Sequence, residues 1–241
     1  MYQPRTYRGW VKDNDLVSFQ VAVKETDLLI RARSELKSEA LASIQRCRTD
    51  LENYIQSHSA FLTALKPLVV EDDAPTIVKE MAEAASEVDV GPMAAVAGAI
   101  AERVGKELLP FSDEVIVENG GDIFLTISRE RRIGVFAGKS VLTQKIAFVI
   151  QSEETPLGVC TSSGTVGHSL SFGRADAVVV FSPSTSLADA AATAICNRVQ
   201  TASDIQEAIE FARSVKGLRG AAIIKGDKIG LWGQIRLASA D

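Results

Sequence analysis

The chain has 241 residues, of which 46% are hydrophobic and 24% charged, as in an ordinary globular protein with a sizeable core. The net charge of −5 argues against a nucleic-acid backbone as the main partner, because no basic stripe outweighs the acidic residues. No apolar run approaches the roughly 18 residues of a membrane span, and no signal peptide or lipid-attachment pattern opens the chain. We therefore expect a cytoplasmic protein that binds neither nucleic acid nor membrane.

Hydrophobic periodicity predicts a hairpin followed by helices in the first half of the chain. Alternating apolar residues over 16–33 are typical of two short strands joined by a turn. Apolar residues three or four apart over 34–65 predict one long amphipathic helix. Further helices are expected over 76–88 and 94–109. The second of these is rich in alanine and glycine, which suits close packing against a sheet.

The second half of the chain is richer in β-structure. Short apolar runs predict strands over 115–117, 123–127, 133–136, 146–150 and 177–181. Helices over 187–199 and 204–215 follow, and a hairpin over 221–237 closes the chain. Helices mixed with antiparallel hairpins favour an α+β fold over a wound parallel sheet.

The segment 160–169, with the sequence CTSSGTVGHS, combines residue types that no packed core needs. Small hydroxyl residues and glycine allow backbone N–H groups to approach an anion closely. The residues of this kind are Thr161, Ser162, Ser163 and Gly164. Cys160 adds a nucleophile and His168 a proton donor or acceptor. We interpret the segment as a ligand-binding loop; the alternative is a plain connection rich in serine and glycine.

A second candidate is the sequence Asn119-Gly120-Gly121-Asp122, which joins two predicted strands. Asn-Gly is a strong signal for a tight hairpin turn. The same residues could also bind a ligand, because the glycines allow it to approach the backbone while Asn119 or Asp122 fixes its polar edge. Spacing alone leaves both interpretations open.

A third candidate is the pair Asp189 and Thr193, which lie four residues apart near the start of a predicted helix. This spacing places a carboxylate and a hydroxyl on one helix face, one turn apart. Mg²⁺ prefers oxygen ligands and usually completes its shell with water and substrate phosphate. The alternative is that Asp189 lies in the first turn because the helix dipole favours an acid there.

These motifs, taken in order, resemble the FAD:protein FMN transferases, the ApbE family. That family has a helix of small residues, an Asn-x-Gly-Gly-Asp-like turn, a Ser/Thr-Gly motif, a histidine, and a helix carrying Ala-Asp-Ala-x-x-Thr. The matching elements here are ENGGD over 118–122, TSSG over 161–164, His168, and ADAAAT over 188–193. The chain looks like a shorter branch of the superfamily that lacks the export signal.

The resemblance implies a single domain over residues 1–241 with a T-fold-like α+β architecture, in which a mixed antiparallel sheet packs against helices. It also implies that Asp189 and Thr193 hold Mg²⁺, and that the turn of residues 119–122 and the loop of residues 160–168 line a pocket for a phosphorylated ligand such as FAD or FMN. Two departures stand against FMN transfer to a protein threonine. The lysine before the small-residue helix is absent, and SLSFGR follows His168 in place of the family's Asp-Pro-x-Thr-Gly-like segment.

The cysteines suggest a hypothesis of another class. Cys47, Cys160 and Cys196 are odd in number and form no C-x-x-C pair, which suits free thiols in a reducing compartment. Cys160 could act as a thiol in sulfide assimilation or sulfur transfer, in which case it should be accessible and acidic. A further alternative is a non-catalytic binding module, with a homodimer that buries apolar strand edges.

Overall fold

The computed structural model describes residues 15–138, 140–143, 145–165 and 171–239. Its main element is an eight-stranded sheet in which every pair of neighbouring strands is antiparallel. In spatial order its strands are β1 (Val17–Val23), β2 (Thr26–Ala32), β3 (Val115–Asn119), β4 (Asp122–Thr126), β7 (Leu157–Ser162), β8 (Ala177–Ser182), β9 (Gly220–Lys225) and β10 (Lys228–Gly233). A three-stranded sheet consists of β11 (Leu237–Ser239), β6 (Ile146–Ile150) and β5 (Arg131–Gly134).

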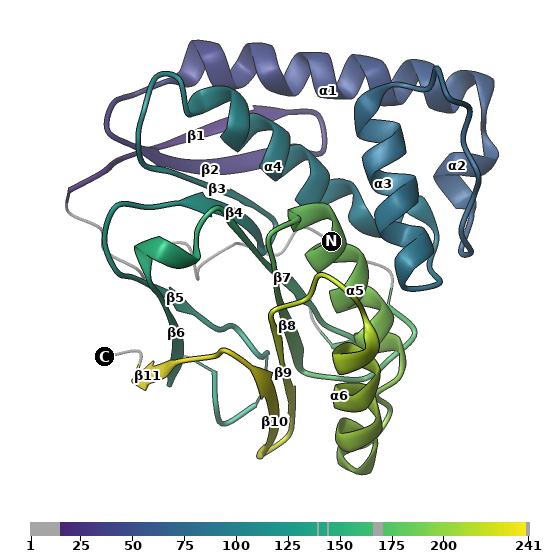
Figure 1. The fold of residues 1–241 in the computed structure, drawn as a ribbon, viewed down its shortest axis with the longest axis vertical. Coiled ribbons are helices and arrows are strands. Elements are labelled where there is room, and N and C mark those ends of the chain that lie inside the picture. The colour runs from purple at the N-terminus through teal and green to yellow at the C-terminus, as the bar shows by residue number, and fades with distance from the viewer. Residues whose placement is uncertain (1–14, 139, 144, 166–170, 240–241) are drawn as a thin grey trace.

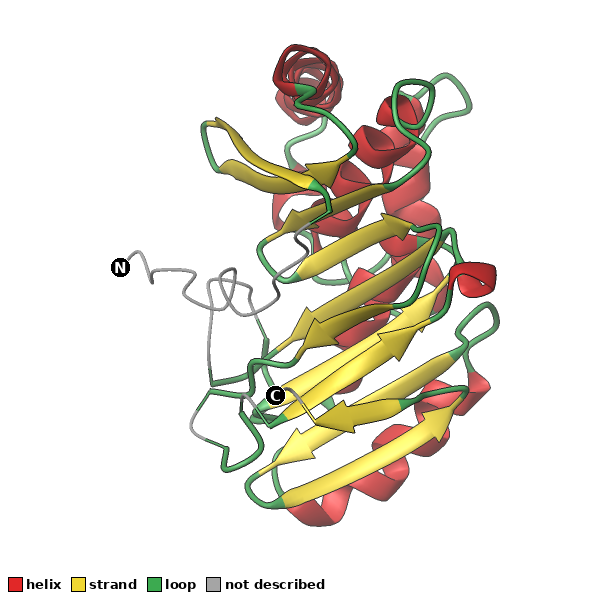
Figure 2. Cartoon of the chain, turned by 90° about the vertical axis from the view of Figure 1, so that its left-hand side faces the viewer, coloured by secondary structure: helices red, strands yellow, loops and turns green. Residues whose placement is uncertain are grey.

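The helices gather on one face of the large sheet, and the small sheet lies on the other side (Figures 1 and 2). The helices are α1 (Lys37–Ser57), α2 (Ala60–Thr63), α3 (Thr76–Glu87), α4 (Val96–Leu108), α5 (Thr185–Asn197) and α6 (Ile205–Ser214). Short 3₁₀ turns occupy Pro92–Ala95, Ser152–Glu154 and Ala202–Asp204. In the described part of the chain, no helix combines the length and the apolar character needed to cross a membrane.

Two cores result from the alternation of side chains along the strands. Val117 and Phe124 are paired across β3 and β4 and belong to the core beneath the helices. Ile116 and Leu125, one residue away on each strand, belong to the core between the two sheets. The antiparallel sheet and its single layer of helices confirm the predicted α+β class.

Three predicted elements differ from those in the structure. The long helix ends at Ser57, where His58 stacks on Tyr54 with ring centroids 4.2 Å apart, and the short helix α2 follows. The last hairpin is divided, because β10 stays in the large sheet whereas β11 pairs with β6 in the small one. The third difference concerns the predicted ligand-binding loop, whose first three residues are the end of the buried strand β7.

Candidate functional site

The sequence Asn119-Gly120-Gly121-Asp122 forms the tight turn between β3 and β4. Gly120 and Gly121 have φ angles of 69° and 112°, which glycine adopts without strain. Asn119 and Asp122 lie opposite each other in the ladder and are both 7% exposed. Because Phe124, two residues beyond Asp122, belongs to the core beneath the helices, both polar side chains lie on the helix face of the sheet.

Each of these two side chains is held by a neighbouring element. The Asn119 side-chain amide donates to the Ala97 carbonyl at the start of α4, at 3.1 Å. Asp122 Oδ1 accepts the backbone N–H of Thr161 in β7, at 3.2 Å. The turn is therefore tied to α4 on one side and to the predicted anion-binding segment on the other.

Asp189 lies in the second turn of α5, with its side chain directed at another helix. Its Oδ2 accepts the backbone N–H of Gly98, at 2.9 Å, and its carboxylate also accepts from the backbone of Ala97. These N–H groups belong to the first turn of α4, so the helix dipole that Asp189 meets is that of α4. The interpretation that placed Asp189 at the start of its own helix is wrong for this reason.

The N-terminus of α5 is occupied by a different acid. Glu102 Oε2 accepts the backbone N–H groups of Thr185 and Ser186, at 2.7 and 3.3 Å. The other oxygen of Glu102 pairs with Lys106 at 2.7 Å. Because a carboxylate already accepts these N–H groups, the start of α5 offers little to an external anion.

Asp122 and Asp189 form a buried acidic pair. Burial raises the pKa of Asp189 to about 7, against the opposing effect of its hydrogen bonds from Gly98 and Ala97. Burial, and then the nearby Asp189 carboxylate, raise the pKa of Asp122 well above its usual range. No Lys or Arg is among the described groups that shift either pKa. Two acids from distant parts of the sequence thus meet in the interior without a compensating cation from the described residues.

Thr193 follows Asp189 by one turn on α5 and is 5% exposed. In the described part of the chain, no three side chains of the His, Cys, Asp or Glu type cluster closely enough to hold a metal ion by themselves. Any cation at Asp122 and Asp189 would therefore need further oxygen ligands from hydroxyl groups, backbone carbonyls, water or a bound phosphate.

Cys160 lies beside the acidic pair but is fully buried. Its Sγ lies 3.4 Å from the Thr185 carbonyl, to which it donates. Burial, together with the carboxylates of Asp122 and Asp189, raises the pKa of Cys160 well above that of an ordinary thiol. The expectation of an accessible and acidic thiol is wrong, because both the core packing and the neighbouring acids oppose formation of the thiolate.

The remaining residues of the predicted loop lie at the end of β7. The Ser162 hydroxyl is buried and makes no hydrogen bond to described residues, although the Cys196 thiol lies nearby. Ser162 pairs with Val178, a residue of the core beneath the helices, so it lies on the same face as Cys160. Thr161, one residue away, lies on the opposite face and contributes its backbone N–H to Asp122. His168 lies outside the described residues.

Gly164 continues from β7 in tight contact with the segment that leads into β8. Its backbone N–H donates to the Ala175 carbonyl at 3.0 Å, and a Cβ at position 164 would clash with the Gly173 carbonyl. Ser163 Oγ accepts the backbone N–H of Thr165 at 3.1 Å. These contacts make the glycine of TSSG a packing requirement, and they place residues 173–175 directly beside the predicted anion-binding residues.

Two residues important for the site's geometry were not among the predicted site residues. Gly98 donates to Asp189, and Glu102 fixes the start of α5. The sequence signal for Gly98 is its position among the small residues of the helix predicted over 94–109, a pattern that by itself indicates close packing and no contact with an acid. The pairing of Asp122 with Asp189 depends on the sheet order β3-β4-β7 and on α5 lying over β7, neither of which has a local sequence signal.

Comparison of the sequence with known proteins identifies a family model and relatives that match most of the chain. The family model described as "AbpE bacteria" matches residues 8–237. A UPF0280 protein of Methanocaldococcus jannaschii is 44% identical over 224 residues, which cover 90% of each chain. A UPF0280 protein of Methanopyrus kandleri is 43% identical over 228 residues, which cover 91% of each chain.

Solved structures show the same fold at low sequence identity. A mutant of the flavin transferase ApbE from Vibrio cholerae has a TM-score of 0.59 and 13% identity, over 90% of this chain and 96% of the other. The apo flavinyl transferase ApbE from Pseudomonas stutzeri also has a TM-score of 0.59 and 13% identity, over 90% of this chain and 94% of the other. At this level of identity the likeness concerns the fold alone.

Proposed function

We propose, from the premise that this chain belongs to the "AbpE bacteria" family of the ApbE-like superfamily, that it binds a phosphorylated nucleotide together with Mg²⁺. The flavin nucleotides FAD and FMN are the ligands we favour, because the solved structures with the same fold are described as flavin transferases. The proposed site comprises the turn of residues 119–122, the end of β7, and Asp189 and Thr193 of α5.

The observation that carries the proposal is the buried pair of Asp122 and Asp189. A buried carboxylate is costly unless it is paired or bound to a metal. Here, two carboxylates share one interior region, both have raised pKa values, and no basic side chain among the described residues contributes to either shift. A divalent cation would offset both charges, whereas a structural ion pair would require a Lys or Arg.

The oxygen donors of the region suit Mg²⁺ better than a softer metal. Asp122, Asp189 and the Thr193 hydroxyl offer hard oxygen ligands. The Ala97 carbonyl, which accepts from Asn119, is a further oxygen next to Gly98, whose N–H donates to Asp189. Mg²⁺ is usually held by one or two carboxylates and by the phosphates of its substrate. When bound here, it would neutralise charge on the ligand's phosphates.

The chain's own residues would orient the nucleotide. The buried hydroxyl of Ser162 is a donor available for a phosphate oxygen, since it forms no hydrogen bond of normal geometry with the described residues, the nearby Cys196 thiol included. Gly120 and Gly121 carry no Cβ, so a ligand can approach the backbone of the turn. Asn119 and Asp122 then fix the position of the turn relative to α4 and β7.

Calorimetric titration of the purified chain with FAD, in the presence and absence of Mg²⁺, tests the proposal. We expect Mg²⁺-dependent binding that Asp189→Asn weakens at least about tenfold, the equivalent of about 1.4 kcal/mol. Asp227→Asn, which changes an exposed carboxylate in the β9–β10 turn, serves as the matched control and should bind like the wild type. Binding that is independent of Mg²⁺, or equal in the two variants, would contradict the proposed metal role.

A further inference from the structure

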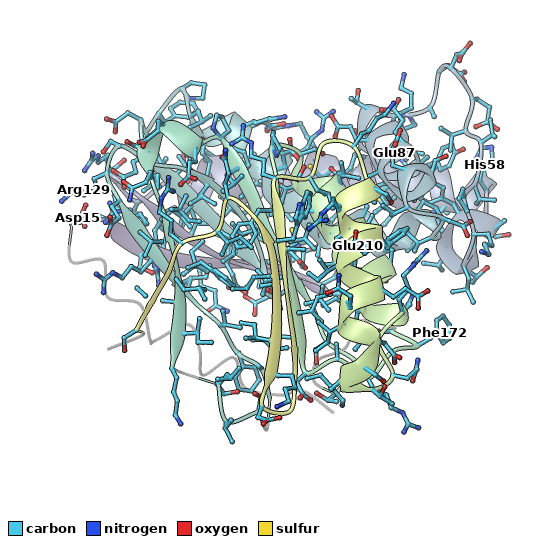
Figure 3. All side chains as sticks on the ribbon, turned by 60° about the horizontal axis from the view of Figure 1, so that its bottom comes forward. Asp15, His58, Glu87, Arg129, Phe172 and Glu210 are labelled. Atoms are coloured by element: carbon cyan, nitrogen blue, oxygen red, sulfur yellow. The ribbon has the colours of Figure 1, made fainter. Side chains whose placement is uncertain are left out.

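The segment that leads into β8 carries an exposed aromatic side chain on a firmly held backbone. The Phe172 side chain is 59% exposed. Its backbone N–H donates to Asn197 Oδ1 at 2.7 Å, and its carbonyl accepts from the Gln200 side chain at 2.9 Å. Figure 3 shows the ring at the edge of the molecule, on the opposite side from Asp15 and Arg129. Because its backbone is held at both polar groups, the exposed ring has a defined place on the surface, where the face of a flat ligand ring can stack on it.

Phe172 is linked to the proposed site through α5. Asn197, which holds it, follows Thr193 by one helical turn and Asp189 by two turns. Residues at this spacing lie along one side of a helix, and eight residues span about 12 Å. The next residue, Gly173, packs directly against Gly164 and against the carbonyl of Cys196. Phe172 therefore lies at the end of the same side of α5 that carries the proposed metal ligands.

The same segment also carries a positive charge. Arg174 is exposed, and its guanidinium forms no ion pair with the described carboxylates. Its backbone is fixed by hydrogen bonds to Val199, at 2.6 Å, and from Lys225, at 2.5 Å. An aromatic ring and a guanidinium with no ion-pair partner among the described residues, two residues apart on a fixed backbone, are a combination that suits a ligand which is both aromatic and anionic.

We propose that Phe172 is the platform on which the aromatic ring of the bound nucleotide stacks. The inference rests on the proposed function, which places the phosphates at Asp189 and Thr193, and it adds the part of the site that recognises the ring. The stacked ring is either the isoalloxazine or the adenine of FAD, since both present a flat π-face to a phenylalanine. Phe172 would set the preference for a ring-bearing ligand over a bare polyphosphate.

The test compares Phe172→Ala with Phe111→Ala, which removes an aromatic side chain of similar exposure, 57%, beyond the end of α4. Loss of one stacking contact should weaken FAD binding about 5- to 100-fold in Phe172→Ala. Binding of inorganic pyrophosphate with Mg²⁺ should stay within about twofold, because pyrophosphate has no ring. Titrations with FMN and with ADP then show which ring stacks, since only the ligand that carries this ring should lose affinity.

A spectroscopic variant gives a readout that a purely structural role would not alter. Where the FMN titration identifies the isoalloxazine as the stacked ring, the indole of Phe172→Trp should quench the fluorescence of bound FMN, whereas Phe111→Trp should not. Where the ADP titration identifies adenine, bound ADP should instead change the fluorescence of the indole in Phe172→Trp and not in Phe111→Trp. If FAD affinity is the same in Phe172→Ala and Phe111→Ala while pyrophosphate still binds, Phe172 is no platform, and the proposed function is unaffected. If the wild type binds neither FAD nor pyrophosphate with Mg²⁺, the proposed function fails, and this inference fails with it.

Discussion

Glu102 and Asp189 join helices α4 and α5 by a reciprocal exchange, in which each carboxylate accepts backbone N–H groups from the first turn of the other helix. Glu102 Oε2 lies 2.7 Å from the Thr185 nitrogen, and Asp189 Oδ2 lies 2.9 Å from the Gly98 nitrogen. In each helix the N–H donor and the acid are four residues apart. In α4, Gly98 donates to Asp189 and Glu102 is the acid; in α5, Thr185 donates to Glu102 and Asp189 is the acid. The exchange satisfies N–H groups that helix starts leave unpaired, and it fixes the Asp189 carboxylate beside Asp122.

The first prediction concerns Glu102. Glu102→Ala leaves the buried N–H groups of Thr185 and Ser186 without their acceptor, and we expect the free energy of unfolding to fall by about 1–3 kcal/mol. Denaturant unfolding measures the change. Glu87→Ala, at the exposed end of α3, is the control and should differ from the wild type by less than about 0.5 kcal/mol. Equal losses in the two variants would show that the exchange contributes nothing to stability.

The second prediction concerns Gly98. Alanine favours a helix over glycine by about 1 kcal/mol, so Gly98→Ala would stabilise an isolated α4. In the folded chain, however, the new Cβ would clash with the Thr185 carbonyl and lie 2.8 Å from Asp189 Cβ. We expect a net loss of about 1–3 kcal/mol in unfolding free energy. Gly134→Ala, where a Cβ has no neighbour within 4 Å, should leave the free energy of unfolding nearly unchanged.

The helices and most strands were predictable because their periodicity is local. The predicted segments over 76–88 and 146–150 correspond to α3 (Thr76–Glu87) and β6 (Ile146–Ile150). The prediction of a loop from residue 160 is wrong for the end of β7, which carries Thr161 and Ser162, because small polar side chains of this kind are typical of loops. The segment is nevertheless a strand, because β4 and β8 pair with β7 on its two sides and satisfy its backbone.

The candidate site could be predicted only in part. The sequence shows the separate motifs, because Asp122 follows two glycines between predicted strands and Asp189 lies among alanines in a predicted helix. Only the resemblance to the ApbE family predicts that the two lie in one pocket. Their meeting as a buried acidic pair follows from β4 and α5 both contacting α4, which are tertiary contacts between residues far apart in the sequence. Burial of Cys160 has the same origin, since α5 covers β7. No local pattern reports which helix lies over which strand.

The third prediction concerns pH in the absence of divalent cations. Burial raises the pKa of Asp189 from its ordinary value of 3.8 to about 7, and burial also raises the pKa of Asp122. Between about pH 4 and pH 7 the folded state therefore holds protons that the unfolded state has released, so the free energy of unfolding should fall as pH rises. Denaturant unfolding in EDTA across this range measures the slope.

Asp189→Asn is the variant that isolates this effect. The amide still offers an oxygen to the Gly98 N–H but does not titrate, and the repulsive charge beside Asp122 is gone. Its stability should depend less on pH than that of the wild type, and the two should differ most near neutral pH. Added Mg²⁺ should restore wild-type stability near pH 7 without affecting the variant. Identical slopes for the two proteins would mean that Asp189 does not titrate in this range.

The fourth prediction concerns the thiols. Cys47, Cys160 and Cys196 are all buried, and burial raises the pKa of Cys47 to about 11 and the pKa values of the other two thiols above the ordinary value. Cys160 has, in addition, two neighbouring carboxylates that oppose its thiolate. We expect slow alkylation of all three in the folded chain, with Cys160 no faster than Cys47, and rapid alkylation once denaturant is added. Mass spectrometry resolves the three rates. This description would be overturned if Cys160 reacted fastest in the folded chain and its rate rose with pH already below pH 8.5, roughly the pKa of a free thiol. Such a result would support a role for Cys160 in sulfur chemistry.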